Sequence, residues 1–154
     1  MTELSIQLLS TVPGLPPVLQ TVHLLGLAML MASAVMMDLR LLSLAGRGQQ
    51  VQEMLQRLFP WVFWALPIML VSGLPFLLAR PQRYLNNPVF AYKAAFLCLA
   101  LIVTFLLWLG FRRGVTQQRG WPIKALALVS LVAWVMTAMS GRWIAYADYL
   151  FWPG

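Results

Sequence analysis

The chain has 154 residues and a formal net charge of +7; 61% of its residues are hydrophobic and only 10% are charged. Soluble domains carry about 25% charged residues, and a water-soluble fold of this length could not bury so much apolar surface. The composition therefore predicts one integral membrane domain. The basic residues lie mostly between apolar runs and form no basic face on a polar domain, so we do not expect nucleic-acid binding.

Four apolar runs are long enough to cross the roughly 30 Å hydrocarbon core of a bilayer as helices. They cover about residues 18–37, 60–79, 89–111 and 122–147. Together they predict an all-α, integral membrane four-helix bundle that occupies the whole chain, residues 1–154, as a single transmembrane domain.

Two shorter segments are expected at the membrane interface. Residues 1–17 hold several aliphatic residues and then a Pro-Gly-Leu-Pro-Pro break, which indicates a short amphipathic segment. The same residues contain no Lys or Arg, so a cleaved signal peptide is not expected. In the polar linker before residue 60, apolar residues at 51, 54, 55 and 58 recur at helical spacing. This pattern predicts a separate helix that lies on the membrane surface.

The basic residues predict the orientation. Seven lie in the two connections between spans one and two and between spans three and four: Arg40, Arg47, Arg57, Arg112, Arg113, Arg119 and Lys124. The other side has only Arg80 and Arg83 near its span ends. Because basic connections stay in the cytoplasm, both termini are expected outside (N-out/C-out).

Three ionisable residues lie inside predicted spans, where such residues are functional candidates by default. His23, Lys93 and Arg142 each lie four or five residues from the outer end of a different span, roughly 6–8 Å below the surface. Arg80 is at the same end, and Tyr146 lies one turn outward of Arg142. Each residue also has a plainer interpretation. Lys and Arg can extend to the lipid headgroups, and a histidine can simply hydrogen-bond within the bundle.

No acidic residue is expected at that depth, so the basic layer calls for an anion from elsewhere. Haem propionates, a lipid phosphate and an anionic substrate all suit it. Haem b requires an axial imidazole, and His23 is the only histidine in the chain. The second axial position is left open between Lys93, a methionine, the His23 of a second copy, or no ligand. Gly26, three residues after His23, either gives room for a flat ring or allows close helix packing.

Two further features are weighed against this interpretation. The nine methionines could serve copper(I), although methionines in a span are more often ordinary packing residues. Asp38, at the cytoplasmic end of the first span, is expected to be structural and to pair with Arg40, Lys124 or Arg112. No hydrolase, kinase or zinc motif is present.

The order and spacing of several short motifs resemble an uncharacterised bacterial family of four-helix membrane proteins. The motifs are His23-Leu-Leu-Gly26, Asp38-Leu-Arg40-Leu-Leu, Phe90-x-x-Lys93 and Gly141-Arg142-x-Ile-Ala-Tyr146. More distantly, a histidine in span one with a lysine in span three is similar to HemJ-type protoporphyrinogen oxidases and to copper-resistance D membrane proteins. The HemJ resemblance implies that His23 is a haem ligand and that Lys93 is a propionate or substrate partner. The chain departs from that pattern in its length and in its fourth span.

The sequence thus favours a haem b-binding protein of the bacterial inner membrane, working in electron transfer or porphyrin redox chemistry. His23 would hold the metal, and Lys93, Arg142 and Arg80 would neutralise the propionates. The alternatives are an accessory membrane subunit without a cofactor and a protein that handles quinone or copper. Beside the lipid bilayer, a second copy of the chain and a larger membrane complex both stay open as partners.

Overall fold

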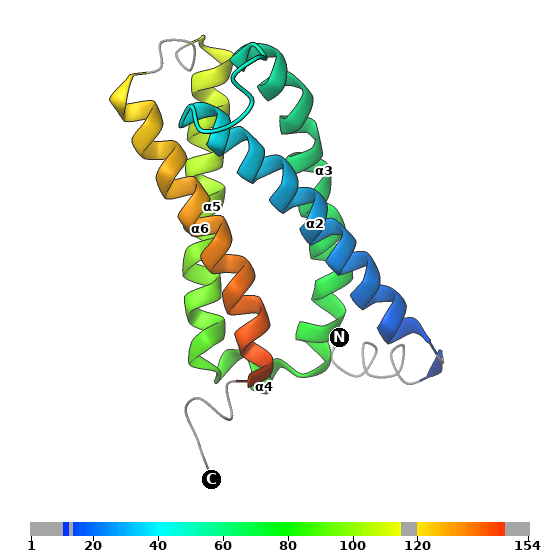
Figure 1. Cartoon of the computed structure of the whole chain (residues 1–154). Helices are drawn as coiled ribbons and strands as arrows, with labels where there is room; N and C mark the ends of the chain where they lie inside the picture. Colours follow the sequence, from blue (N-terminus) through cyan, green and yellow to red (C-terminus); the bar gives the residue numbers. More distant parts are fainter. Residues whose placement is uncertain (1–10, 13, 115–119, 147–154) are drawn as a thin grey trace.

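The computed structural model describes residues 11–12, 14–114 and 120–146. Four helices in this part are long and apolar enough to cross a membrane. The helices are α2 (Leu15–Leu41), α3 (Val51–Ala79), α4 (Pro81–Leu85), α5 (Pro88–Arg112) and α6 (Trp121–Trp143), followed by the short 3-10 helix η2 (Ile144–Tyr146). Of these described helices, α4 and η2 are too short to span. The predicted all-α membrane bundle is confirmed (Figure 1).

The first turns of the long helices carry recognisable start signals. Gly14 precedes α2 with φ of +93°, a conformation that suits glycine, and two prolines follow it in the first turn. Before α5, the side chain of Asn87 accepts a hydrogen bond from the backbone N–H of Val89 at 2.9 Å, and Pro88 is the first helical residue. This cap fixes where α5 begins and hence places Lys93 on its second turn.

Two helices begin several residues before the predicted start of their span. The helix α2 begins at Leu15, so residues 15–17 belong to the first spanning helix; residues 1–10 and 13 of the predicted interfacial segment lie outside the described residues. The predicted surface helix is instead the beginning of α3, which continues through Pro60 without a break. Val51, Leu55 and Phe59 are buried in the same core as residues beyond the proline. This continuous packing outweighs the one backbone hydrogen bond that Pro60 cannot make.

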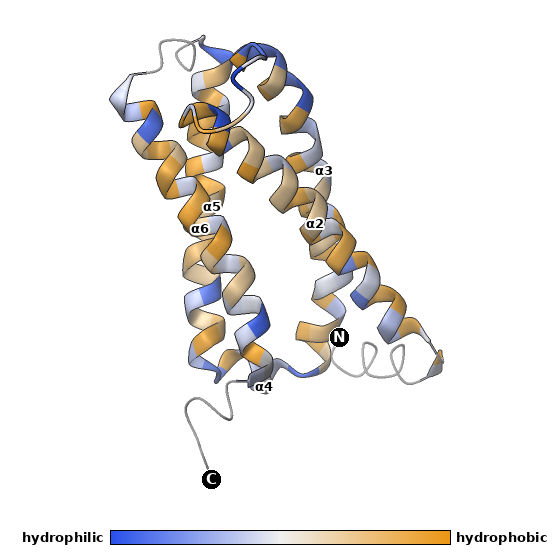
Figure 2. Ribbon diagram, viewed as in Figure 1, coloured by the Kyte–Doolittle hydropathy of each residue, from blue (hydrophilic) through white to orange (hydrophobic). Residues whose placement is uncertain are grey.

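The four long helices form two closely packed pairs. The helix α2 packs against α3, and α5 packs against α6; α2 also contacts α6 and so joins the pairs. Figure 2 shows apolar residues along most of each helix and hydrophilic residues concentrated in the connections at the end where α2 finishes. In the absence of a hydrophobic force in lipid, such pairs are held by close packing and interhelical hydrogen bonds.

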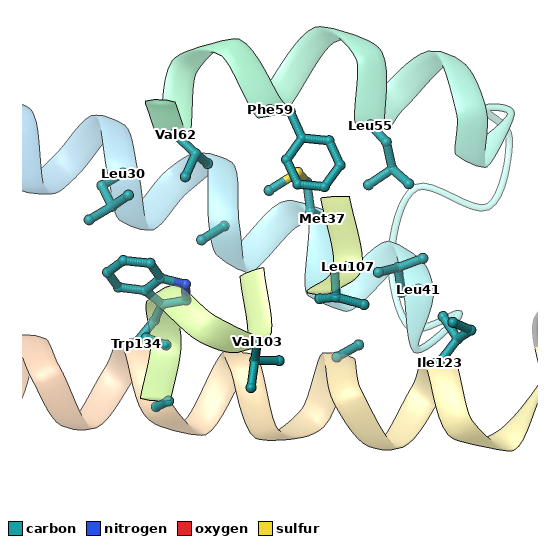
Figure 3. Close-up of a cluster of buried hydrophobic side chains, with 14 of the residues drawn as sticks. Leu30, Met37, Leu41, Leu55, Phe59, Val62, Val103, Leu107, Ile123 and Trp134 are labelled. Carbon is teal, nitrogen blue, oxygen red and sulfur yellow. The ribbon is translucent and has the colours of Figure 1, made fainter. Parts of the chain in front are cut away.

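The hydrophobic core lies in one half of the bundle. Side chains from all four helices meet there, among them Leu30, Phe59, Leu107 and Trp134 (Figure 3). We call the other end, where α2 and α5 begin and α3 and α6 finish, the α4 end. From Trp134 toward the α4 end, no described buried residue is larger than valine. The buried residues described in that half are Gly26, Ser72, Val89, Thr137 and Ser140.

Two polar contacts lie at the opposite end. Asp38 is 2% exposed, and its carboxyl group has a hydrogen bond with Ser130 of α6. The partner of the Asp38 carboxyl group is thus the Ser130 hydroxyl, where a basic side chain was expected. Arg40, also buried, donates from Nη2 to the backbone carbonyl of Gln49 and thereby anchors the connection to α3. Both groups act as structural ties between elements.

Candidate functional site

The imidazole of His23 lies between α2 and α3 on the third turn of α2 and is half-buried. Its Nδ1 is 3.1 Å from the backbone carbonyl oxygen of Met69 and 3.1 Å from the hydroxyl oxygen of Ser72, both in α3. No described residue is hydrogen-bonded to Nε2. One ring nitrogen is thus held by the neighbouring helix and the other is left available.

Gly73 provides the space for this ring. A Cβ atom at Gly73 would lie 2.9 Å from Cε1 of His23, closer than real Cβ contacts, and 3.2 Å from Nδ1, tighter than most of them. The imidazole therefore lies directly against the backbone of α3. Gly73 and Ser72 were not predicted as site residues, although a polar residue and a glycine side by side within an apolar span are a usable signal.

Gly26 lies against side chains of α3, and no open space adjoins it there. A Cβ atom there would lie 3.1 Å from both Cγ2 of Ile68 and Cγ of Met69. Gly26 itself is buried. Of the two interpretations offered for this glycine, the structure supports the close packing of α2 on α3.

Lys93 belongs to the other helix pair. Its side chain is half-buried, and Nζ lies 3.5 Å from the position that a Cβ atom would take on Gly141 of α6. The ammonium group interacts electrostatically with His23. Two of the three predicted basic residues, one from each helix pair, are therefore within electrostatic range of each other.

The remaining predicted site residues lie on the surface of the same end. Arg142 is exposed, and its Nη2 donates a hydrogen bond of 3.4 Å to the hydroxyl of Tyr146, with the guanidinium 5.6 Å from the ring centroid. Arg80 is exposed at the end of α3. These side chains are near the site along the chain, but their described contacts do not include His23 or Lys93.

The charge at the α4 end is not balanced by protein groups in the described part of the chain. The acidic residues described are Asp38 and Glu53, and both lie at the opposite end of the bundle. No group of three or more His, Cys, Asp or Glu side chains that could hold a metal ion occurs among the described residues. The site therefore combines one imidazole with one ammonium group and suits a ligand that brings its own negative charge.

The fold and the site define a multi-pass membrane protein in which a histidine of one helix pair is within electrostatic range of a lysine of the other, both inside the spans. The chain belongs to a family of unknown function, DUF6644, whose model matches residues 13–147. Neither the curated proteins nor the solved structures gave a match. The resemblance to HemJ-type and copper-resistance D proteins therefore stands on the quoted motifs alone.

Proposed function

We propose that this protein binds one haem b at the α4 end and works in electron transfer or porphyrin redox chemistry in the membrane. One observation carries the proposal: Nδ1 of His23 is held by α3, and Nε2 is left available on a half-buried ring that is within electrostatic range of Lys93. A histidine that ligates a metal commonly donates its other ring N–H to a backbone carbonyl in this way.

The single imidazole suits haem better than a bare metal ion. An ion held by protein side chains alone needs about three or four ligands, whereas the porphyrin supplies four of the ligands of a haem iron and leaves one or two axial positions to the protein. In the described residues only His23 offers a nitrogen ligand of that kind. Haem bound there would supply one-electron exchange between its two iron states.

Lys93 suits a propionate. Its ammonium group lies within the helices, and a charge in that position is costly without a partner of opposite sign. The guanidinium of Arg142 is directed to Tyr146. We therefore assign the main propionate contact to Lys93, and leave to Arg142 and Arg80 the attraction of the anion from the surface.

The orientation is part of the proposal. The surplus of Lys and Arg in the connections at the end opposite α4 favours that end in the cytoplasm, and so the site near the outer face of a bacterial inner membrane. Single cysteines in a Cys98→Ser background, at exposed Gln82 or at exposed Gly48, test it in intact cells. An impermeant maleimide is expected to label position 82 alone. Labelling of position 48 alone would reverse the orientation.

The binding proposal is tested by adding haemin, and separately iron-free protoporphyrin IX, to the detergent-purified full-length chain. Both ligands carry the same propionates, but only haemin can use His23. We expect a Soret band with haemin that saturates at one per chain, and much weaker binding of protoporphyrin IX. Equal affinities for haemin and protoporphyrin IX would show that His23 is not an iron ligand. No binding of either, with the chain co-purifying in a larger complex, would favour the accessory subunit.

A further inference from the structure

We propose that Ser72 and Gly73 of α3 are positioning residues for His23. Together with the Met69 carbonyl they hold the neutral ring in the tautomer that carries its hydrogen on Nδ1, so that Nε2 presents a lone pair. The part of this inference that concerns iron rests on the proposed function, and the part that concerns the tautomer does not.

The Met69 contact sets the tautomer. A backbone carbonyl oxygen only accepts hydrogen bonds, and it lies 3.1 Å from Nδ1 of His23. The bond therefore exists only when Nδ1 carries hydrogen. In a neutral imidazole the second nitrogen is then an acceptor.

Ser72 could have opposed this choice, because a hydroxyl group both donates and accepts. Its Oγ, however, lies 2.6 Å from the carbonyl oxygen of Ile68, a short and favourable hydrogen bond within α3. This bond uses the only hydrogen on the hydroxyl group. Ser72 is thus left as an acceptor toward Nδ1 at 3.1 Å. Two acceptors from α3 then converge on the same ring nitrogen, and both favour a hydrogen there.

Gly73 determines where the ring lies. The 2.9 Å separation between Cε1 and a notional Cβ shows that even alanine would push the ring away from the helix. The ring lies within 3.1 Å of both acceptors only because α3 has no side chain at this position. Helix packing alone does not require this glycine, because its nearest described neighbours are atoms of the imidazole.

This arrangement defines what His23 can bind. A lone pair on Nε2 accepts a metal centre or an acidic hydrogen, and it cannot donate to a carbonyl group. The hydrogen bond at Nδ1 also raises the basicity of Nε2 as a ligand. Ser72 and Gly73 would therefore act on a bound iron through His23 without touching it.

The chain has one histidine, so protein labelled only with [15N]histidine gives the signals of a single imidazole. We expect the cofactor-free wild type, in mildly alkaline buffer where the ring is neutral, to show a protonated Nδ1 and an unprotonated Nε2. A protonated Nε2 in the wild type would overturn the inference. If the expected tautomer is found in a protein that binds no haemin, the proposed function fails and the positioning role stands.

Variants separate positioning from general stability. Gly73→Ala is expected to displace the ring and give a mixture of tautomers, and Ser72→Ala is expected to give a smaller proportion of the second tautomer because Met69 still accepts. Ser140→Ala is the matched control, since it removes another buried hydroxyl that is bonded within its own helix. In haem-loaded protein, Ser72→Ala should raise the midpoint potential and Ser140→Ala should not. Wild-type tautomer signals in folded Ser72→Ala and Gly73→Ala would refute the positioning role.

Discussion

His23→Ala is expected to lower the affinity for haemin by more than about 100-fold. Removal of a hydrogen-bonding partner of a metal ligand typically costs about 10- to 100-fold, and loss of the ligand itself should cost more. The affinity of the variant for haemin should fall to that for protoporphyrin IX, because both then bind through the propionates alone. Titrations followed by the Soret band and by quenching of tryptophan fluorescence measure both values.

Thr21→Ala is the control for this variant. Thr21 lies on the same helix, is exposed, and hydrogen-bonds only within its own turn to the carbonyl oxygen of Pro17, according to its described contacts. The Thr21→Ala variant should bind haemin with the affinity of the wild type. Added imidazole should restore the Soret band to His23→Ala, since it can replace the missing ligand next to the space left by the side chain. Undiminished haemin binding by folded His23→Ala would contradict the assignment.

Lys93→Gln is expected to weaken haemin and protoporphyrin IX to the same extent. A hydrogen bond to a charged group contributes about 1.5–3 kcal/mol, which corresponds to a loss of affinity of roughly 10- to 100-fold. Because the propionates are common to both ligands, the ratio of the two affinities should stay as in the wild type. The His23→Ala variant shows a different pattern, because it makes the affinities for haemin and protoporphyrin IX equal.

Lys124→Gln removes the same charge from an exposed position at the opposite end of the bundle and is the matched control. It should leave both affinities unchanged, which separates a local contact from the effect of net charge. If Lys93→Gln lowered the affinity for haemin alone, Lys93 would act at the iron and the propionate role would be wrong. If both lysine variants had equal effects, the contribution of Lys93 would be non-specific attraction.

The four spans were predictable because their signal is the length and hydropathy of a run, which requires no knowledge of tertiary structure. The start of α3 was not, because Pro60 looked like the first residue of a helix. What carries the helix through Pro60 is the burial of Val51, Leu55 and Phe59 against other helices. That packing is a tertiary effect, and the local pattern at a proline does not contain it.

The site was predictable in depth but not in detail. Position along each span predicted that His23 and Lys93 share a layer, and the two groups are within electrostatic range of each other. The rotation of each helix could not be derived, because helices that are apolar all round have no polar face to orient them. The sequence therefore could not tell that His23 lies on Gly73, that Gly26 packs on α3, or that Arg142 turns to Tyr146.

The most direct test of the haem site is the absorption spectrum of the wild-type protein, purified in detergent from cells supplied with a haem precursor, before and after reduction with dithionite. A Soret band that shifts on reduction, with about one haem per chain, is the expected result. A colourless protein, prepared beside a known haem-containing membrane protein that is fully loaded, would contradict a haem site at His23.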